Sequence, residues 1–287
     1  MHKRKVYTVT RPRGKLCSLA SKLGQGSHMK RTLFTAVLLV SALAAGAASA
    51  QPAKAQEVKV YAAAVAKTPL SAIAAEYENA TGNKVTLVFD TAGATAQKFR
   101  ADPDAALLIT TMPLIRNAER TGALRDGITT PLGSTVAGVA VTPGSKKPDV
   151  SSPEKLKAAL LAAMRIAVSD PARGATVGTH FMKVIEALGV KDAVLPNITF
   201  APDGVETMRR VVAGTADLGV SQSSEIVQAS PDAMAGPFPA EFALATDFSL
   251  WHRNAIAPAV ADLVARMTGP AGREKFAADG ILPPAAR

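Results

Sequence analysis

Hydrophobic and polar positions along the chain predict strands followed by helices. The clearest stretch runs from Arg165 to Gly189, where a short apolar run is broken by a polar turn containing Gly174. Apolar residues then recur with a period near 3.6 residues until Gly189. This pattern predicts a strand, a turn and a helix. Because backbone N–H groups point out of a helix start, the turn is a candidate site for an anion or a carbonyl group.

The same pattern occurs earlier in the chain. Apolar runs predict strands at residues 58–62, 84–89 and 105–109, and helices follow two turns of small residues and threonines at 63–68 and 90–95. A β-α-β-α-β series forms a parallel sheet with right-handed crossovers, and its strand-to-helix turns lie at one edge. Ligands of such sheets bind at that edge. The sequence therefore predicts an α/β fold with its ligand site there.

The first 50 residues are interpreted as an upstream leader and a signal peptide, with Met29 as the natural start. A basic pair follows Met29, Leu33–Ala45 is apolar and uncharged, and small residues up to Ala50 form a cleavage pattern. A membrane anchor is the alternative, but the apolar run is short for a span of about 20 residues. Cleavage near Ala50 predicts a protein of the periplasm.

Removal of this segment changes the charge of the protein. The whole chain has a formal net charge of +10, from 33 Lys and Arg and 23 Asp and Glu. Nine of the basic residues and none of the acidic ones precede residue 51, so the mature chain has a charge near +1. This balance argues against a nucleic-acid partner. The single cysteine, Cys17, also precedes residue 51, so we expect no disulfide in the mature chain.

Seven segments in order resemble the molybdate-binding periplasmic proteins of ABC importers, over about all of the mature chain. These segments are VKVYAAA, the small-residue turn after VTLVFD, DAALLIT, LGSTVAGVAV, RIAVSDP, ADLGVSQSSE and MTGPAGREKFAADGI. The resemblance implies two lobes, each a mostly parallel sheet flanked by helices, joined by a two-strand hinge. It also implies closure around a small solute or oxyanion, which a permease in the inner membrane then receives.

We place the boundary between the lobes near residues 134–145. This range contains the predicted strand 136–141, which either closes the first lobe or leads out of it. A break rich in proline, glycine and serine follows at residues 143–153. The expected division is 57–135 with 243–287 for the first lobe, and 136–242 for the second. We expect the protein to be a monomer.

In the family, hydroxyl groups and backbone N–H groups of four turns hold the oxyanion, together with one tyrosine. Here Val65 stands where a serine is expected, and Gln222 stands in place of the tyrosine. Loss of about three hydroxyl hydrogen bonds, at roughly 1 kcal/mol each, would weaken the binding of a tetrahedral oxyanion. The identity and the charge of the ligand therefore stay open. The candidate ligand-binding residues are Ala64, Val65, Thr91, Ala92, Gly93, Thr95, Thr111, Ser169, Arg173, Ala175, Thr176, Val177, Val205, Ser221 and Gln222.

Several of these residues have a second interpretation. Thr91 and Thr95 fit a helix-capping role as well as a ligand role. Arg173 fits either a bidentate grip on an anion or a solvated loop. Asp90 and Asp170 lie beside the expected site and would repel an anion unless they are paired, which leaves an uncharged or cationic ligand open.

No catalytic or metal-binding motif stands out in the sequence. The histidines lack a second histidine or cysteine at metal-ligand spacing, and no serine lies in a recognised nucleophile motif. We therefore expect a binding protein that is not an enzyme and needs no cofactor or metal. A secreted enzyme that uses the same cleft, and a sensor subunit that docks on a receptor, are the alternatives.

Overall fold

The computed structural model describes residues 55–283. The expected leader, signal peptide and cleavage site lie outside these residues. Within them, no helix combines the length and apolar character needed to cross a bilayer.

The first lobe is built on the parallel sheet that the sequence predicts. Its parallel strands are β1 (Glu57–Ala63), β2 (Lys84–Asp90) and β3 (Ala105–Thr111). Two antiparallel strands extend the sheet: β9 (Ala245–Arg253) pairs with β3, and β4 (Gly127–Val141) pairs with β9.

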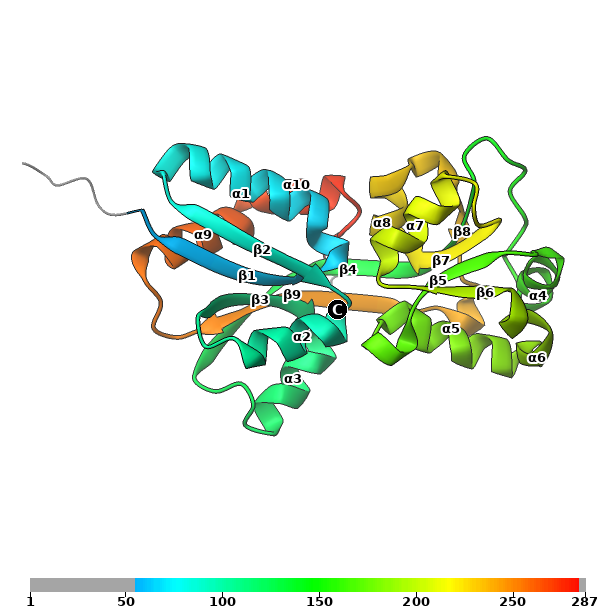
Figure 1. The fold of residues 1–287 in the computed structure, drawn as a ribbon, viewed down its shortest axis with the longest axis horizontal. Helices are drawn as coiled ribbons and strands as arrows, with labels where there is room; N and C mark the ends of the chain where they lie inside the picture. The colour runs from blue at the N-terminus through cyan, green and yellow to red at the C-terminus, as the bar shows by residue number, and fades with distance from the viewer. Residues whose placement is uncertain (1–54, 284–287) are drawn as a thin grey trace, which may run out of the picture. The chain divides into compact units, whose positions relative to one another are not determined.

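Helices cover both faces of this sheet because its central strands are apolar on both sides. Leu107 and Ile109 of β3 pack on one face, while Leu108 packs on the other. The first face carries α1 (Lys67–Thr81), α9 (Pro258–Thr268) and α10 (Pro270–Ala278), and the second carries α2 (Ala92–Ala101) and α3 (Met112–Arg120) (Figure 1).

The second lobe repeats the scheme with shorter strands. β5 (Ile166–Ser169) pairs in parallel with β6 (Ile198–Ala201) and β7 (Leu218–Gln222), and β8 (Met234–Pro237) pairs with β4. One face packs against α4 (Pro153–Ala162), α5 (Thr176–Ala187) and α6 (Lys191–Val194), and the other against α7 (Gly204–Val212) and α8 (Ser223–Ala229). Short 3-10 turns complete the chain: η1 (Ala64–Ala66), η2 (Pro171–Arg173), η3 (Leu195–Asn197), η4 (Pro231–Ala233) and η5 (Ala240–Phe242).

Strand β4 connects the two lobes. Residues Gly127 to Val136 pair with β9, and residues Ala137 to Val141 pair with β7, so one strand belongs to both sheets (Figure 1). The strand order is β2-β1-β3-β9-β4-β7-β5-β6, and β8 pairs with β4 outside this path. The chain returns to the first lobe at Leu244, whose carbonyl accepts a hydrogen bond from the Ala137 N–H group. The strand-to-helix turns of the two lobes therefore approach one another beside this crossing.

Candidate functional site

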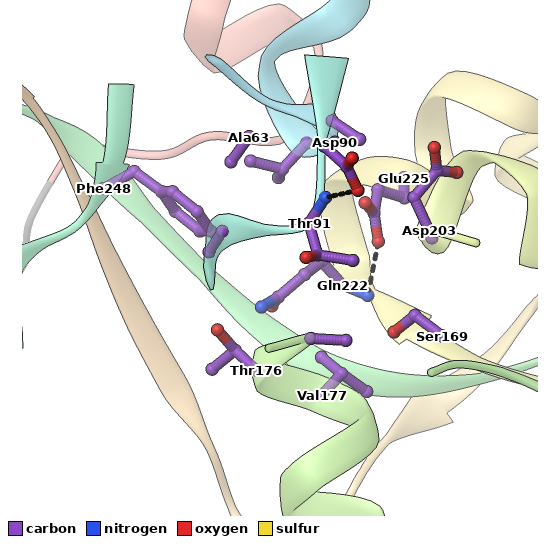
Figure 2. A pocket seen from close by; sticks show the side chains of 15 residues that line it. Ala63, Asp90, Thr91, Ser169, Thr176, Val177, Asp203, Gln222, Glu225 and Phe248 are labelled. Carbon is purple, nitrogen blue, oxygen red and sulfur yellow. Dashed lines mark hydrogen bonds between the residues drawn. The ribbon is translucent and has the colours of Figure 1, made fainter. Parts of the chain in front are cut away.

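A small cavity lies where strand-to-helix turns from both lobes meet (Figure 2). Its volume is about 30 Å³, whereas one water molecule needs about 10–15 Å³, so the cavity favours a compact solute. The first lobe contributes Ala63, Ala64, Val65, Asp90, Thr91, Ala92 and Phe248. The second lobe contributes Ser169, Ala175, Thr176, Val177, Asp203, Gly204, Gln222 and Glu225.

The structure brings many of the candidate ligand-binding residues into this lining, but not all of them. Those that line the cavity are Ala64, Val65, Thr91, Ala92, Ser169, Ala175, Thr176, Val177 and Gln222. Those that do not line it are Gly93, Thr95, Thr111, Arg173, Val205 and Ser221. Val205 instead lines a larger neighbouring hollow of about 400 Å³, bounded by the start of α1 and by α7 and α8.

Arg173 contacts a carboxylate of the protein itself. Its guanidinium group donates to both oxygens of Asp90, at 2.8 and 2.9 Å, and Lys98 lies 2.7 Å from the same carboxylate. Burial alone would raise the pKa of Asp90, but hydrogen bonds from Lys98, the Thr91 N–H group and Arg173 lower it overall. Asp90 is therefore ionised and paired, so it does not present a free negative charge to the cavity.

Two glycines bring the lobes into backbone contact. The Gly93 N–H group donates to the Gly174 carbonyl at 3.1 Å, and a Cβ atom on Gly93 would lie 2.8 Å from the Gly174 Cα atom. Thr91 adds to this contact, because its hydroxyl donates to the Arg173 carbonyl and accepts from the Ala94 N–H group at 3.2 Å. Thr91 thus caps α2 and links the two lobes at the same time.

The helix starts near the cavity fall into two groups. The Thr91 hydroxyl caps α2, and Asp203 caps α7 by accepting from the Glu206 N–H group at 2.8 Å. In contrast, α5 follows Ala175 with no side-chain cap, so its first N–H groups remain available for a ligand.

The Ser169 hydroxyl is a second free group at this position. Ser169 ends β5, is only 5% exposed and lines the cavity, and its hydroxyl has no hydrogen-bond partner among the described residues (Figure 2). The hydroxyl oxygen is not one of the fully buried unpaired side-chain atoms of the described residues, so it is accessible from the cavity. It can therefore form a hydrogen bond with water or with a solute there.

Glu225 is a buried carboxylate in the cavity wall that the sequence analysis did not identify. It is 8% exposed, and its Oε2 atom accepts from the Ser221 hydroxyl at 2.5 Å and from the Gln222 N–H group at 3.2 Å. Burial raises its pKa to about 7, and nearby Asp203 also raises it, although the two hydrogen bonds oppose the shift. Ser221 does not line the cavity itself, but its hydroxyl group holds the Glu225 carboxylate that does.

Gly204 makes this position of Glu225 possible. A Cβ atom on Gly204 would lie 1.9 Å from Oε2 of Glu225, so a larger residue would exclude the carboxylate. The spacing of Gln222 and Glu225 is that of a helix capping box, which a sequence reading can detect. The contact with Gly204 joins two separate turns, so no pattern in the local sequence indicates it. The other lining residues absent from the candidate set are Ala63, Asp90, Asp203 and Phe248.

Gln222 lies at the junction of the lobes. Its side-chain carbonyl accepts from Thr135 of β4 at 2.6 Å, and its amide donates to Thr246 of β9 at 3.2 Å. Both ends of the side chain are therefore used within the protein, and Gln222 holds β7 against the strands that connect the lobes.

A comparison with protein-family models identifies the family of this chain. The chain belongs to the bacterial extracellular solute-binding protein family. The family model matches residues 58–282, which include every cavity residue. A comparison with curated protein sequences gives no significant match.

Several solved structures share the fold at low sequence identity. The periplasmic molybdate-binding protein of Azotobacter vinelandii has a TM-score of 0.63 at 18% identity, over 79% of this chain and 99% of that one. Peb3 from Campylobacter jejuni has a TM-score of 0.56 at 18% identity, over 78% and 98%. The sulfate-binding protein of Mycobacterium tuberculosis has a TM-score of 0.56 at 14% identity, over 79% and 87%. At these identities the likeness shows the fold and leaves the ligand open.

Proposed function

We propose that this protein is the periplasmic solute-binding component of an ABC importer. It takes a small polar solute or oxyanion into the cavity between its lobes, as a monomer, and presents the complex to a permease in the inner membrane. Its role is binding and not catalysis. The family and the two-lobed fold support this proposal.

The observation that carries the proposal is the composition of the cavity wall. Both lobes contribute to it, and the second lobe offers the uncapped start of α5 beside the unpaired hydroxyl of Ser169. A solute at this point would accept hydrogen bonds from the second lobe while touching Ala64 and Thr91 of the first. Binding therefore stabilises the arrangement in which the lobes meet.

A thermal-shift screen of the purified mature protein tests the proposal. The solutes are molybdate, tungstate, sulfate, phosphate and small carboxylates. A ligand at a hundredfold excess over its Kd stabilises the folded state by about 2.7 kcal/mol, which corresponds to roughly 5–10 °C in Tm for a chain of this size.

A pair of tryptophan variants shows whether binding occurs in the cavity. Thr176→Trp fills the cavity and should abolish the shift. Ala172→Trp, at an exposed position of the neighbouring turn, should retain it. Absence of any shift across the whole library would contradict the proposed function.

A further inference from the structure

The walls of the cavity offer different hydrogen-bonding groups. The start of α5 and the Ser169 hydroxyl offer donors. Glu225 offers an acceptor, because its Oε1 atom has no hydrogen-bond partner among the described residues, while Oε2 is engaged by Ser221 and Gln222. No lysine or arginine is among the residues that line the cavity, and the charge of Asp90 is already balanced by Lys98 and Arg173.

This arrangement distinguishes between anions of equal size and charge. An ionised carboxylate can only accept hydrogen bonds. Sulfate and molybdate, as fully deprotonated anions, also only accept, so such an anion would face Glu225 acceptor to acceptor. Hydrogen phosphate has the same tetrahedral shape and can have the same charge, but it keeps one O–H group that can donate to Glu225.

We propose that the cavity selects a compact anion that keeps an O–H donor, with hydrogen phosphate as the test case, over anions that carry none. The anionic oxygens would accept from the start of α5 and from Ser169, and the O–H group would donate to Glu225. This inference rests on the proposed solute-binding function and specifies the chemical class of the solute.

Acidic conditions should reduce this selectivity. The pKa of Glu225 is raised to about 7, so at pH 5.5 most molecules carry a protonated Glu225 that can itself donate to a sulfate oxygen. Three groups of charges face this carboxylate: Asp203 at the start of α7, Asp90 with its two cations across the cavity, and Lys67 across the neighbouring hollow. The pKa of Asp90 is lowered, so its charge stays constant over this range.

Isothermal titration of the mature protein with hydrogen phosphate and with sulfate, at pH 8 and pH 5.5, tests the proposal. At pH 8 we expect phosphate to bind at least tenfold more tightly than sulfate. At pH 5.5 the sulfate affinity should rise severalfold. Glu225→Gln, whose amide can both donate and accept, should bring the ratio at pH 8 below threefold, whereas Glu241→Gln, at an exposed site, should leave it unchanged.

Two further arms keep the test decisive. The pH series uses the unaltered protein, so it stands even if Glu225→Gln folds poorly. Asp203→Asn keeps a helix-capping side chain but removes a charge that raises the Glu225 pKa, so the pH at which sulfate binding improves should move downward.

Equal affinity for sulfate and phosphate at pH 8, or an unchanged ratio in Glu225→Gln, would overturn the proposal. If neither anion binds while another solute in the thermal-shift screen does, this inference fails and the proposed function stands. If no solute binds at all, both fail.

Discussion

The Arg173 guanidinium group of the second lobe forms hydrogen bonds of 2.8 and 2.9 Å to the two carboxylate oxygens of Asp90 in the first lobe. This contact lies beside the solute cavity and joins turns that are 83 residues apart in the sequence. Each lobe has its own hydrophobic core. The interaction therefore opposes separation of the lobes and does not hold either lobe folded.

Arg173→Ala should let the lobes separate without unfolding either of them. Asp90 keeps Lys98 as a partner, and the arginine is partly exposed, so we expect a loss of less than about 1 kcal/mol in unfolding free energy. Small-angle X-ray scattering should show a larger radius of gyration. Arg116→Ala, at an exposed position of α3, is the control. An unchanged radius would show that Arg173 does not hold the lobes together.

Gly93→Ala should separate the lobes by steric contact. The new Cβ atom would lie 2.8 Å from the Cα atom and 3.0 Å from the carbonyl oxygen of Gly174, and backbone atoms cannot move aside as a side chain can. We expect at least a tenfold loss of solute affinity with little change in Tm, measured by titration and calorimetry. Gly144→Ala meets no neighbouring atom, so it should retain affinity, although the φ of 80° at this position disfavours alanine and should lower Tm. Retained affinity in Gly93→Ala would mean that this contact is not needed for binding.

Ser169→Ala should reduce affinity while leaving stability nearly unchanged. The hydroxyl has no partner among the described residues, so its removal leaves no other buried group unpaired. Loss of one hydrogen bond worth about 1 kcal/mol to the solute corresponds to about a fivefold rise in Kd. Paired titration and urea denaturation would measure both effects. A marked loss of stability with unchanged Kd would assign Ser169 a structural role.

The buried carboxyl group of Glu225 should make the folded protein less stable as the pH rises from about 4.5 to about 7. Its folded-state pKa is near 7 and its ordinary value is 4.5, so in this window the folded state binds the proton more strongly than the unfolded state does. The contribution of this carboxyl group to the stability of the folded protein is fully present below pH 4.5 and is lost by pH 7. Over the window the loss is about 3 kcal/mol at most.

Urea denaturation at pH 4.5, 6 and 8 measures this effect. Glu225→Gln keeps an acceptor for Ser221 and Gln222 but does not titrate, so its stability should vary less with pH than that of the unaltered protein. Glu241→Gln should follow the unaltered protein. Parallel pH profiles for Glu225→Gln and the unaltered protein would show that the pKa of this carboxyl group is not raised in the folded state.

Local patterns were sufficient to predict the parallel sheets and the strand, turn and helix around residues 165–189. These features depend on neighbours in the sequence, and the structure has β5 and α5 at Ile166–Ser169 and Thr176–Ala187. The first half of β4 was not predicted, because its alternation is interrupted by Pro131 and by two half-buried threonines, Thr129 and Thr130. It becomes a strand by pairing with β9, which follows more than 100 residues later.

The site was harder to predict than the fold because its decisive contacts join distant turns. Sequence reasoning gave Arg173 a choice between binding a ligand and lying solvated in a loop, and it could not identify Asp90 as its partner. It also noticed the small residues around Gly93 without showing that they meet Gly174. The orientation of Glu225 depends on the missing side chain of Gly204, which belongs to another turn.

The position of β9 also constrains the order in which the protein can fold. This strand lies between β3 and β4, so the sheet of the first lobe lacks a central member until residues 245–253 have been made. The second lobe is complete in sequence before that point. Assembly should therefore start in the middle of the polypeptide and finish with its two ends, and the long loop closure between β3 and β9 should set the slow kinetic step.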